Sequence, residues 1–129
     1  MMVDADARYS KSHEWVKKQA GNVFSVGLSG YAVEQLGKIV YVKLPAVGKE
    51  LGRDEPFGVI ESVKSTVELS SPLCGKIVSV NAAVGDNPAM LGKDAYGAGW
   101  LIRIEAADLA EADAMMDADA YREFLQAEG

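Results

Sequence analysis

The stretch GKIVYVKLPAVG at residues 37–48 returns at residues 75–85 as GKIVSVNAAVG. The second copy begins at Gly75, 38 residues after the first begins at Gly37, and a second apolar run follows each copy, at residues 57–62 and 100–105. Two copies are too few for a solenoid, which needs about three repeats or more. Each copy has an apolar face that it cannot bury alone. We therefore predict two β-units that pack face to face about a pseudo-twofold axis and share one core.

Around the repeat, alternating apolar and β-branched residues predict a mostly β chain. The expected strands are residues 13–18, 22–29, 38–44, 57–62, 67–70, 76–81 and 100–105. A short helix is expected at residues 31–36, where Gly37 would end it. A C-terminal helical region is expected at residues 106–127, which are rich in Ala, Leu, Met and Glu, with Asp117 capping its last part.

The composition indicates one globular domain, residues 1–129, with its core in residues 9–105. Hydrophobic residues make up 49% of the chain and the formal net charge is −6, which disfavours nucleic acid and anionic membranes as partners. No apolar run approaches the ~20 residues of a membrane span. The single cysteine, Cys74, excludes an intrachain disulfide, and the acidic residues 1–8 lack the apolar segment of a signal peptide. We therefore expect a cytoplasmic protein.

The segment ESVKST at residues 61–66 lies between the two copies of the repeat. Strand-like residues flank it closely, which predicts a tight hairpin with Lys64 near its tip. Such a tip holds a long side chain and its primary amine away from the body of the domain, and acylation would remove the charge of that amine. The small residues Ser62 and Ser65 would leave the side chain unhindered. A lysine in a turn is usually only a solubilising residue, so the hairpin alone leaves both interpretations open.

Glu61, Ser62, Val63 and Lys64 resemble the lipoylation motif of the glycine cleavage H proteins. The resemblance runs from Tyr9 to Leu125. It also covers SHEWV at 12–16, LGKIVYV at 36–42 with LP at 44–45, SP at 71–72 with Gly75, and Gly97, Gly99 and Trp100. It implies a barrel-sandwich hybrid of the lipoyl/biotinyl-like type. It also implies a carrier that is not itself an enzyme and that is a monomer when free.

The resemblance further implies that lipoate is attached covalently to Lys64 and that Glu61, Ser62, Val63 and Ser65 form the recognition hairpin. The implied partners are a pyridoxal-phosphate glycine decarboxylase, an aminomethyltransferase, a dihydrolipoamide dehydrogenase and a lipoate-attaching enzyme. The decarboxylase would load the arm with an aminomethyl group. The transferase would pass its carbon to tetrahydrofolate, and the dehydrogenase would reoxidise the arm.

By the same resemblance, Ser12, Glu14 and Glu68 match positions associated with the docked arm. A carboxylate there would stabilise a cationic aminomethyl group, and exclusion of water would slow its loss. Family members often carry Asp at the position of Glu68. They also often carry Asn-x-x-Pro-Tyr where this chain has GKDAY at residues 92–96. The missing proline is expected to loosen that loop.

Four alternatives stay open: a biotinyl domain, a lipoyl domain of a 2-oxoacid dehydrogenase, an H-like lipoyl relay for another pathway, and a small thiol enzyme. Biotinyl domains usually flank the lysine with methionines, whereas Val63 and Ser65 flank it here. Lipoyl domains of 2-oxoacid dehydrogenases continue into a linker and a catalytic domain. An H-like protein could serve as a lipoyl relay for another pathway. A small thiol enzyme could use Cys74 with His13, the only histidine, although no motif accompanies them; no metal site is expected.

Overall fold

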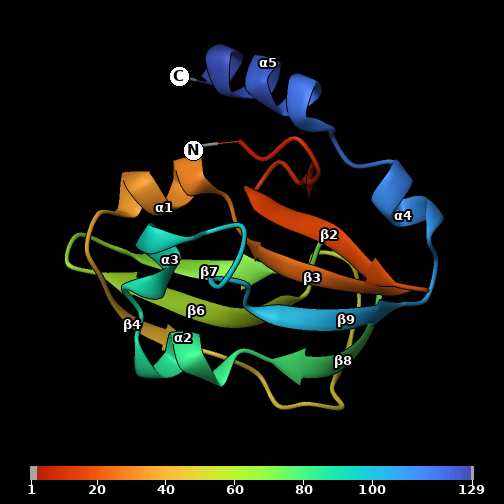
Figure 1. The fold of residues 1–129 in the computed structure, drawn as a ribbon, viewed down its shortest axis with the longest axis horizontal. Coiled ribbons are helices and arrows are strands. Elements are labelled where there is room, and N and C mark those ends of the chain that lie inside the picture. The colour runs from red at the N-terminus through yellow and green to blue at the C-terminus, as the bar shows by residue number, and fades with distance from the viewer. Residues whose placement is uncertain (1–2, 129) are drawn as a thin grey trace.

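The computed structural model describes residues 3–128, and the chain folds into two antiparallel sheets with short helices around them (Figure 1). The strands are β1 (Arg8–Tyr9), β2 (Glu14–Ala20), β3 (Val23–Leu28), β4 (Ile39–Lys43), β5 (Glu50–Leu51), β6 (Pro56–Ser62), β7 (Thr66–Ser70), β8 (Gly75–Val80) and β9 (Ile102–Ala106). The helices are α1 (Gly30–Leu36), α2 (Ala82–Asp86), α3 (Met90–Lys93), α4 (Ala110–Asp113) and α5 (Ala118–Glu128).

The larger sheet has six strands in the order β1-β2-β3-β9-β8-β5, and the smaller has three in the order β4-β6-β7. Together they form a flattened, barrel-like sandwich, which confirms the predicted mostly β fold. All seven predicted strands are present, with ends displaced by up to two residues. The strands β1 and β5 were not predicted because each has only two residues, too few to show an alternation. The short helices α2 and α3 were also not predicted.

The two copies of the repeat form equivalent strand pairs. β4 pairs with β6, and β8 pairs with β9. The register shifts between Ile39 and Tyr41 in the first pair and between Ile77 and Ser79 in the second. Val40 and Val78, the fourth residue of each copy, therefore occupy matching β-bulges, and both are exposed. Beyond the strands the copies differ, because residues 47–48 form a turn whereas the matching residues of the second copy lie in α2.

The core lies between the two sheets. Ile60 and Leu69 of the smaller sheet and Ile77 and Ile104 of the larger sheet have no exposed surface. Burying each side chain of this size stabilises the folded chain by roughly 1.5–3 kcal/mol. A second cluster joins Tyr9 and Trp15 to Tyr121 of α5. The rings of Tyr9 and Tyr121 stack in parallel, with centroids 4.1 Å apart.

The predicted C-terminal helical region is confirmed and consists of two helices, α4 and α5. Its first expected residue, Ala106, instead ends strand β9. Between them Met116 pairs with Tyr9 through two backbone hydrogen bonds of 2.8 and 3.1 Å. This pairing breaks the helix despite the helix-forming residues around it. Asp117 caps α5 as predicted, because its carboxylate accepts a hydrogen bond of 2.9 Å from the N–H of Ala120.

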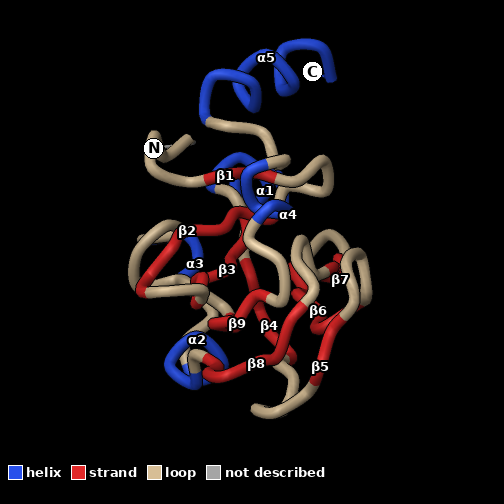
Figure 2. Tube along the Cα trace, turned by 90° about the vertical axis from the view of Figure 1, so that its right-hand side faces the viewer, coloured by secondary structure: helices blue, strands red, loops and turns tan. Residues whose placement is uncertain are grey.

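The helix α5 lies over β1 at one end of the molecule, and α2 lies at the opposite end in both views (Figures 1 and 2). Among residues 3–128, no helix has both the length and the apolar character that crossing a bilayer requires.

We expect Gly58→Ala to destabilise the sheet that carries the predicted hairpin. A Cβ atom on Gly58 would lie 2.5 Å from the backbone oxygen of Lys43, so β4 would have to move away from β6. The free energy of unfolding in urea should fall by about 1–3 kcal/mol. The matched control is Gly85→Ala in α2, where no atom lies within 4 Å of the added methyl group. The control should retain or slightly increase stability, and equal losses in the two variants would contradict this explanation.

Candidate functional site

The turn between β6 and β7 is closed by the side chain of Ser62. Its hydroxyl accepts hydrogen bonds from the backbone N–H groups of Lys64 (3.2 Å) and Ser65 (3.1 Å). It also donates to the carbonyl of Ser65 at 3.1 Å, and the Ser62 N–H donates to the same carbonyl at 2.8 Å. The sequence identified Ser62 as a small residue that leaves the Lys64 side chain unhindered, whereas in the structure its hydroxyl also holds the turn together.

A second set of contacts holds the tip of the turn to the residue that precedes β4. The N–H of Val63 donates to the carbonyl of Lys38 at 3.0 Å, just before β4 begins. Val63, Lys64 and Ser65 are all exposed, and Glu61 is exposed on the strand below them, opposite Thr66. Lys64 is therefore held at its backbone from two sides while its amine is open to water. These features fit a lysine that an enzyme acylates, because both the lysine and its neighbours Val63 and Ser65 are exposed.

Lys64 extends its side chain over the end of α1. Gly37 ends this helix with a positive φ of 73°, a conformation that favours glycine. A Cβ atom on Gly37 would lie 3.7 Å from Cε of Lys64. The sequence indicated Gly37 as a helix stop and as the start of the first repeat copy, and its position beside the lysine became visible only in the folded chain.

Glu14 lies in a compact polar cluster with Ser10, Ser12 and Ser70. Glu14 is 1% exposed. Its Oε1 accepts hydrogen bonds from the hydroxyls of Ser10 (2.7 Å) and Ser12, and its Oε2 accepts one of 3.2 Å from the N–H of Ser70. The structure thus brings the two predicted residues Ser12 and Glu14 together. Ser10 and Ser70 were not predicted, and Ser70 has no sequence signal that relates it to a residue 56 positions away.

Burial raises the pKa of the Glu14 carboxyl above its ordinary value, although the hydrogen bonds from Ser12, Ser10 and Ser70 oppose that rise. Ionisation of Glu14 is therefore costly in the folded state. A buried carboxylate of this kind, close to the surface, is a group that a cation could neutralise.

Glu68 lies two residues before Ser70 on the same strand, β7. It is exposed on β7 opposite Val59, and it lines a surface hollow with Lys43 and Pro45. This hollow does not include Ser12 or Glu14 among its lining residues. The three residues predicted for the docked arm thus comprise the buried carboxylate of Glu14, its exposed hydrogen-bond partner Ser12, and the exposed carboxylate of Glu68.

His13 and Cys74 lie in unlike surroundings. The Nδ1 atom of His13 is 2.8 Å from the hydroxyl of Tyr121, and its ring also contacts those of Tyr31 and Phe124. Cys74 is half-buried beside Glu111, whose carboxylate accepts a 2.9 Å hydrogen bond from the Cys74 N–H. Each residue is accounted for by local packing and hydrogen bonding. Within residues 3–128 there is also no cluster of three or more His, Cys, Asp or Glu side chains that could bind a metal.

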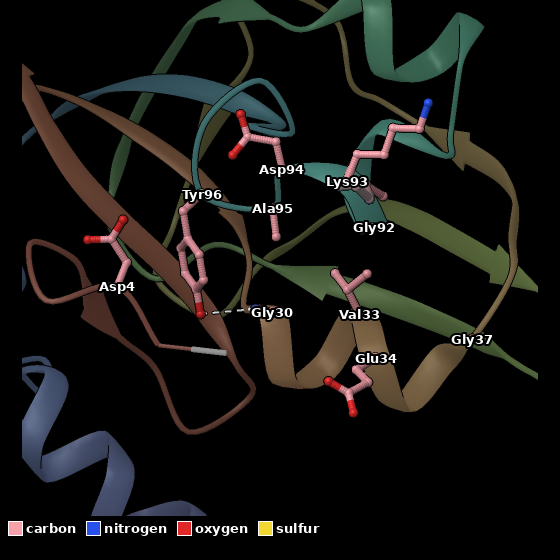
Figure 3. A pocket seen from close by; sticks show the side chains of 11 residues that line it. Asp4, Gly30, Val33, Glu34, Gly37, Gly92, Lys93, Asp94, Ala95 and Tyr96 are labelled. Atoms are coloured by element: carbon pink, nitrogen blue, oxygen red, sulfur yellow. Dashed lines mark hydrogen bonds between the residues drawn. The ribbon is translucent and has the colours of Figure 1, made fainter. Parts of the chain in front are cut away.

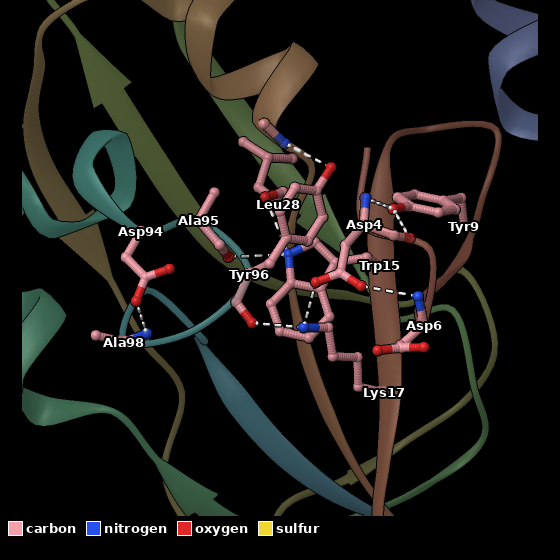
Figure 4. A network of polar contacts seen from close by, with 11 residues as sticks. Asp4, Asp6, Tyr9, Trp15, Lys17, Leu28, Asp94, Ala95, Tyr96 and Ala98 are labelled. Carbon is pink, nitrogen blue, oxygen red and sulfur yellow. Dashed lines mark hydrogen bonds and ion pairs between the residues drawn. The ribbon is translucent and has the colours of Figure 1, made fainter. Parts of the chain in front are cut away.

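The loop at residues 92–96 is held at several points despite its missing proline (Figure 4). The carbonyl of Ala95 accepts a hydrogen bond of 3.1 Å from the indole of Trp15, and that of Tyr96 accepts one of 2.9 Å from the ammonium of Lys17. The same ammonium forms an ion pair of 2.6 Å with Asp4. The predicted loosening stays a prediction.

Comparisons with known proteins agree with these features. The sequence model of a family described as Glycine cleavage H-protein matches residues 7–128. Glycine cleavage system H proteins from Symbiobacterium thermophilum and Myxococcus xanthus are 45% and 46% identical over 124 residues; each alignment covers 96% of this chain, and 96% and 95% of the two relatives. The crystal structure of a glycine cleavage system H protein from Mycobacterium marinum is 34% identical, with a TM-score of 0.84 over 98% of this chain and 99% of that one. This chain belongs to the glycine cleavage H-protein family.

Proposed function

We propose that this chain carries a lipoyl group on Lys64 and shuttles the aminomethyl group of glycine from a pyridoxal-phosphate glycine decarboxylase to an aminomethyltransferase that uses tetrahydrofolate. A dihydrolipoamide dehydrogenase then reoxidises the carrier, and a separate enzyme attaches the lipoate. The family is one of lipoyl carriers, non-catalytic subunits of the glycine cleavage system. The observation that carries the proposal is the exposed amine of Lys64 on a turn braced by Ser62 and Lys38.

The rigid turn and the flexible side chain of Lys64 have different roles. When bound, the lipoyl group supplies a disulfide that can accept the aminomethyl unit and be regenerated by oxidation. The protein fixes the origin of the arm at Lys64, so the bound unit stays at a high effective concentration for each partner in turn. The exposed Val63 and Ser65 give the partners access to the amine from both sides.

Glu14 is the residue best placed to stabilise a cationic load. Its buried carboxylate already accepts hydrogen bonds from two hydroxyls and one N–H, and an ammonium group could replace the hydroxyl of Ser12 or Ser10 as a donor. Holding the load there would also keep water from it and so slow its hydrolysis. Glu68 is exposed on β7, two residues before Ser70, and could contact the arm from there.

Intact mass measurement tests the attachment site. The chain is co-expressed with a lipoate-attaching enzyme in lipoate-replete cells, and we expect a gain of one lipoyl group. Lys64→Arg should abolish the gain, because a guanidinium is not acylated there, whereas the neighbouring Lys38→Arg should retain it. A gain in Lys64→Arg, or none in the unaltered chain, would refute the proposal.

The rate of formaldehyde release from the loaded carrier tests Glu14. We expect Glu14→Gln to release formaldehyde roughly tenfold faster, which corresponds to one charge-assisted hydrogen bond of about 1.5 kcal/mol. In the unaltered carrier, release should accelerate as the pH falls through the pKa of Glu14, because the neutral carboxyl no longer attracts the cation. Glu105→Gln, at an exposed strand position, is the control. Unchanged decay in Glu14→Gln would remove Glu14 from the mechanism.

The stability of Glu14→Gln separates a functional carboxylate from a structural one. Because the folded-state pKa is raised, the carboxyl favours folding below its unfolded pKa, and that contribution disappears as the pH rises through the folded value. At pH 7 the amide, which can accept from Ser70 and donate to the hydroxyls, should be at least as stable by urea unfolding. A large loss of stability at pH 7 would instead indicate that the charge serves the fold.

A further inference from the structure

The turn that presents Lys64 lacks the backbone conformation that most two-residue hairpin turns use. The N–H of Ser62 donates to the carbonyl of Ser65, so Val63 and Lys64 alone connect the two strands. The favoured two-residue turns need a positive φ at one or both of these positions, which is why Asn and Gly are common there. In the described chain neither Val63 nor Lys64 has a positive φ. Because other two-residue turns tend to splay the strands, this one needs support from outside its own backbone.

The hydroxyl of Ser62 supplies that support. In an ordinary β-turn the N–H of the fourth residue donates to the carbonyl of the first. Here the N–H of Ser65, the fourth residue, donates to the Ser62 hydroxyl at 3.1 Å, and the N–H of Lys64 donates to the same oxygen at 3.2 Å. A serine side chain can replace a backbone carbonyl in this way. The shape of the turn therefore depends on one side chain.

Val63 is held separately, by the segment that follows α1. Its N–H donates to the carbonyl of Lys38 at 3.0 Å, and Lys38 comes directly after Gly37, which ends α1 (Figure 3). The first residue of α1 is held in turn by the hydroxyl of Tyr96, which accepts a 2.9 Å hydrogen bond from its N–H (Figure 3). Removal of the Ser62 hydroxyl would leave these contacts intact, so only the residues after Val63 would gain freedom.

We propose that Ser62 is a positioning residue for the acylation of Lys64, which acts by fixing the backbone of the turn and not by contact with the attaching enzyme. This inference rests on the proposed function. In the reaction, the unprotonated Nζ of Lys64 attacks the carbonyl carbon of an activated lipoyl donor. A carbon–nitrogen bond forms, the bond to the leaving group breaks with its electron pair, and Nζ loses one proton.

The attaching enzyme depends on the turn because it must reach the bare lysine. The roughly five bonds from Cα to Nζ of Lys64 span roughly 6 Å at about 1.2 Å per bond. The active site of the enzyme must therefore come close to the backbone of residues 63–65, and a mobile turn would have to be ordered on binding. After attachment, roughly seven further bonds separate Nζ from the ring sulfur, so the enzymes that act on the arm work farther from the turn.

Backbone NMR order parameters of the full-length, unlipoylated chain test whether Ser62 fixes the turn. In Ser62→Ala the order parameters of Lys64 and Ser65 should fall from about 0.85, a rigid value, to below about 0.6, whereas that of Val63 should not change. Ser62→Thr keeps a hydroxyl and should retain the original values. Unchanged order parameters at Lys64 and Ser65 in Ser62→Ala would overturn the proposal.

Steady-state kinetics of the attaching enzyme, with the carrier as the varied substrate, test whether the fixed turn matters for acylation. Ser62→Ala should raise KM for the carrier roughly tenfold with little change in kcat, because the turn must then be ordered on binding. Ser62→Thr should restore KM. The matched control is Thr66→Val, which removes an exposed hydroxyl at the same sequence distance from Lys64 and keeps a branched strand residue. The control should behave like the unaltered chain, and a normal KM in Ser62→Ala would contradict the proposal.

Two further measurements separate positioning from a loss of reactivity. A small amine-reactive ester needs only an accessible amine, so it should acylate Lys64 at equal rates in Ser62→Ala and in the unaltered chain. After complete lipoylation, dihydrolipoamide dehydrogenase should reoxidise both carriers at equal rates. A loss in either measurement as large as that with the attaching enzyme would overturn the proposal.

Intact mass measurement keeps the two proposals apart. If the unaltered chain gains no lipoyl group, the proposed function fails. If the unaltered chain gains one and Ser62→Ala gains it equally fast at low carrier concentration, only the inference about Ser62 fails.

Discussion

The central position of β6 in the smaller sheet is the constraint on which the rest of the site depends. β6 pairs with β4 on one side and β7 on the other, and Ile60 in its middle is fully buried in the core. Gly58 lets β4 approach closely, because a side chain there would meet the backbone of Lys43. The strand therefore cannot shift without disturbing both neighbours and the core. Its C-terminal end carries that rigidity to Ser62, which closes the turn around Lys64.

The carboxylate of Glu14 joins the two sheets through a buried hydrogen bond. Glu14 opens β2 of the larger sheet, and its carboxylate accepts from the N–H of Ser70 at the end of β7 in the smaller one. β7 is an edge strand, so this N–H is free of sheet pairing and available to a side chain. Because burial makes ionisation of this carboxyl unfavourable, a carboxylate at this position does not serve the stability of the fold alone. It is consistent with a site that receives a positive charge from outside.

The C-terminal helix contributes to the same region from the other side. Tyr121 stacks on Tyr9, and its hydroxyl is 2.7 Å from that of Ser29, which caps α1. His13, directly before Glu14, lies within hydrogen-bonding distance of the same hydroxyl and has a φ of 74°. Tyr121 thus connects α5, the start of α1 and the residue beside the buried carboxylate. The single histidine takes part in this packing arrangement directly before Glu14.

Sequence alone determined what depends on local pattern. The alternation of apolar residues predicted seven strands, and the repeat predicted two equivalent strand pairs. The motif around Lys64 predicted an attachment point, which stays a prediction. Each of these depends on residues close together in the chain or on a recurring pattern. The break between α4 and α5 depends also on the pairing of Met116 with Tyr9, which local helix propensity does not record.

Only the tertiary structure decided what surrounds the attachment point. Folding brought Ser70 to Glu14 and placed Gly37 beside Lys64. These relations join residues tens of positions apart. They depend on how two sheets and a helix pack, and no periodicity or spacing along the chain records that packing.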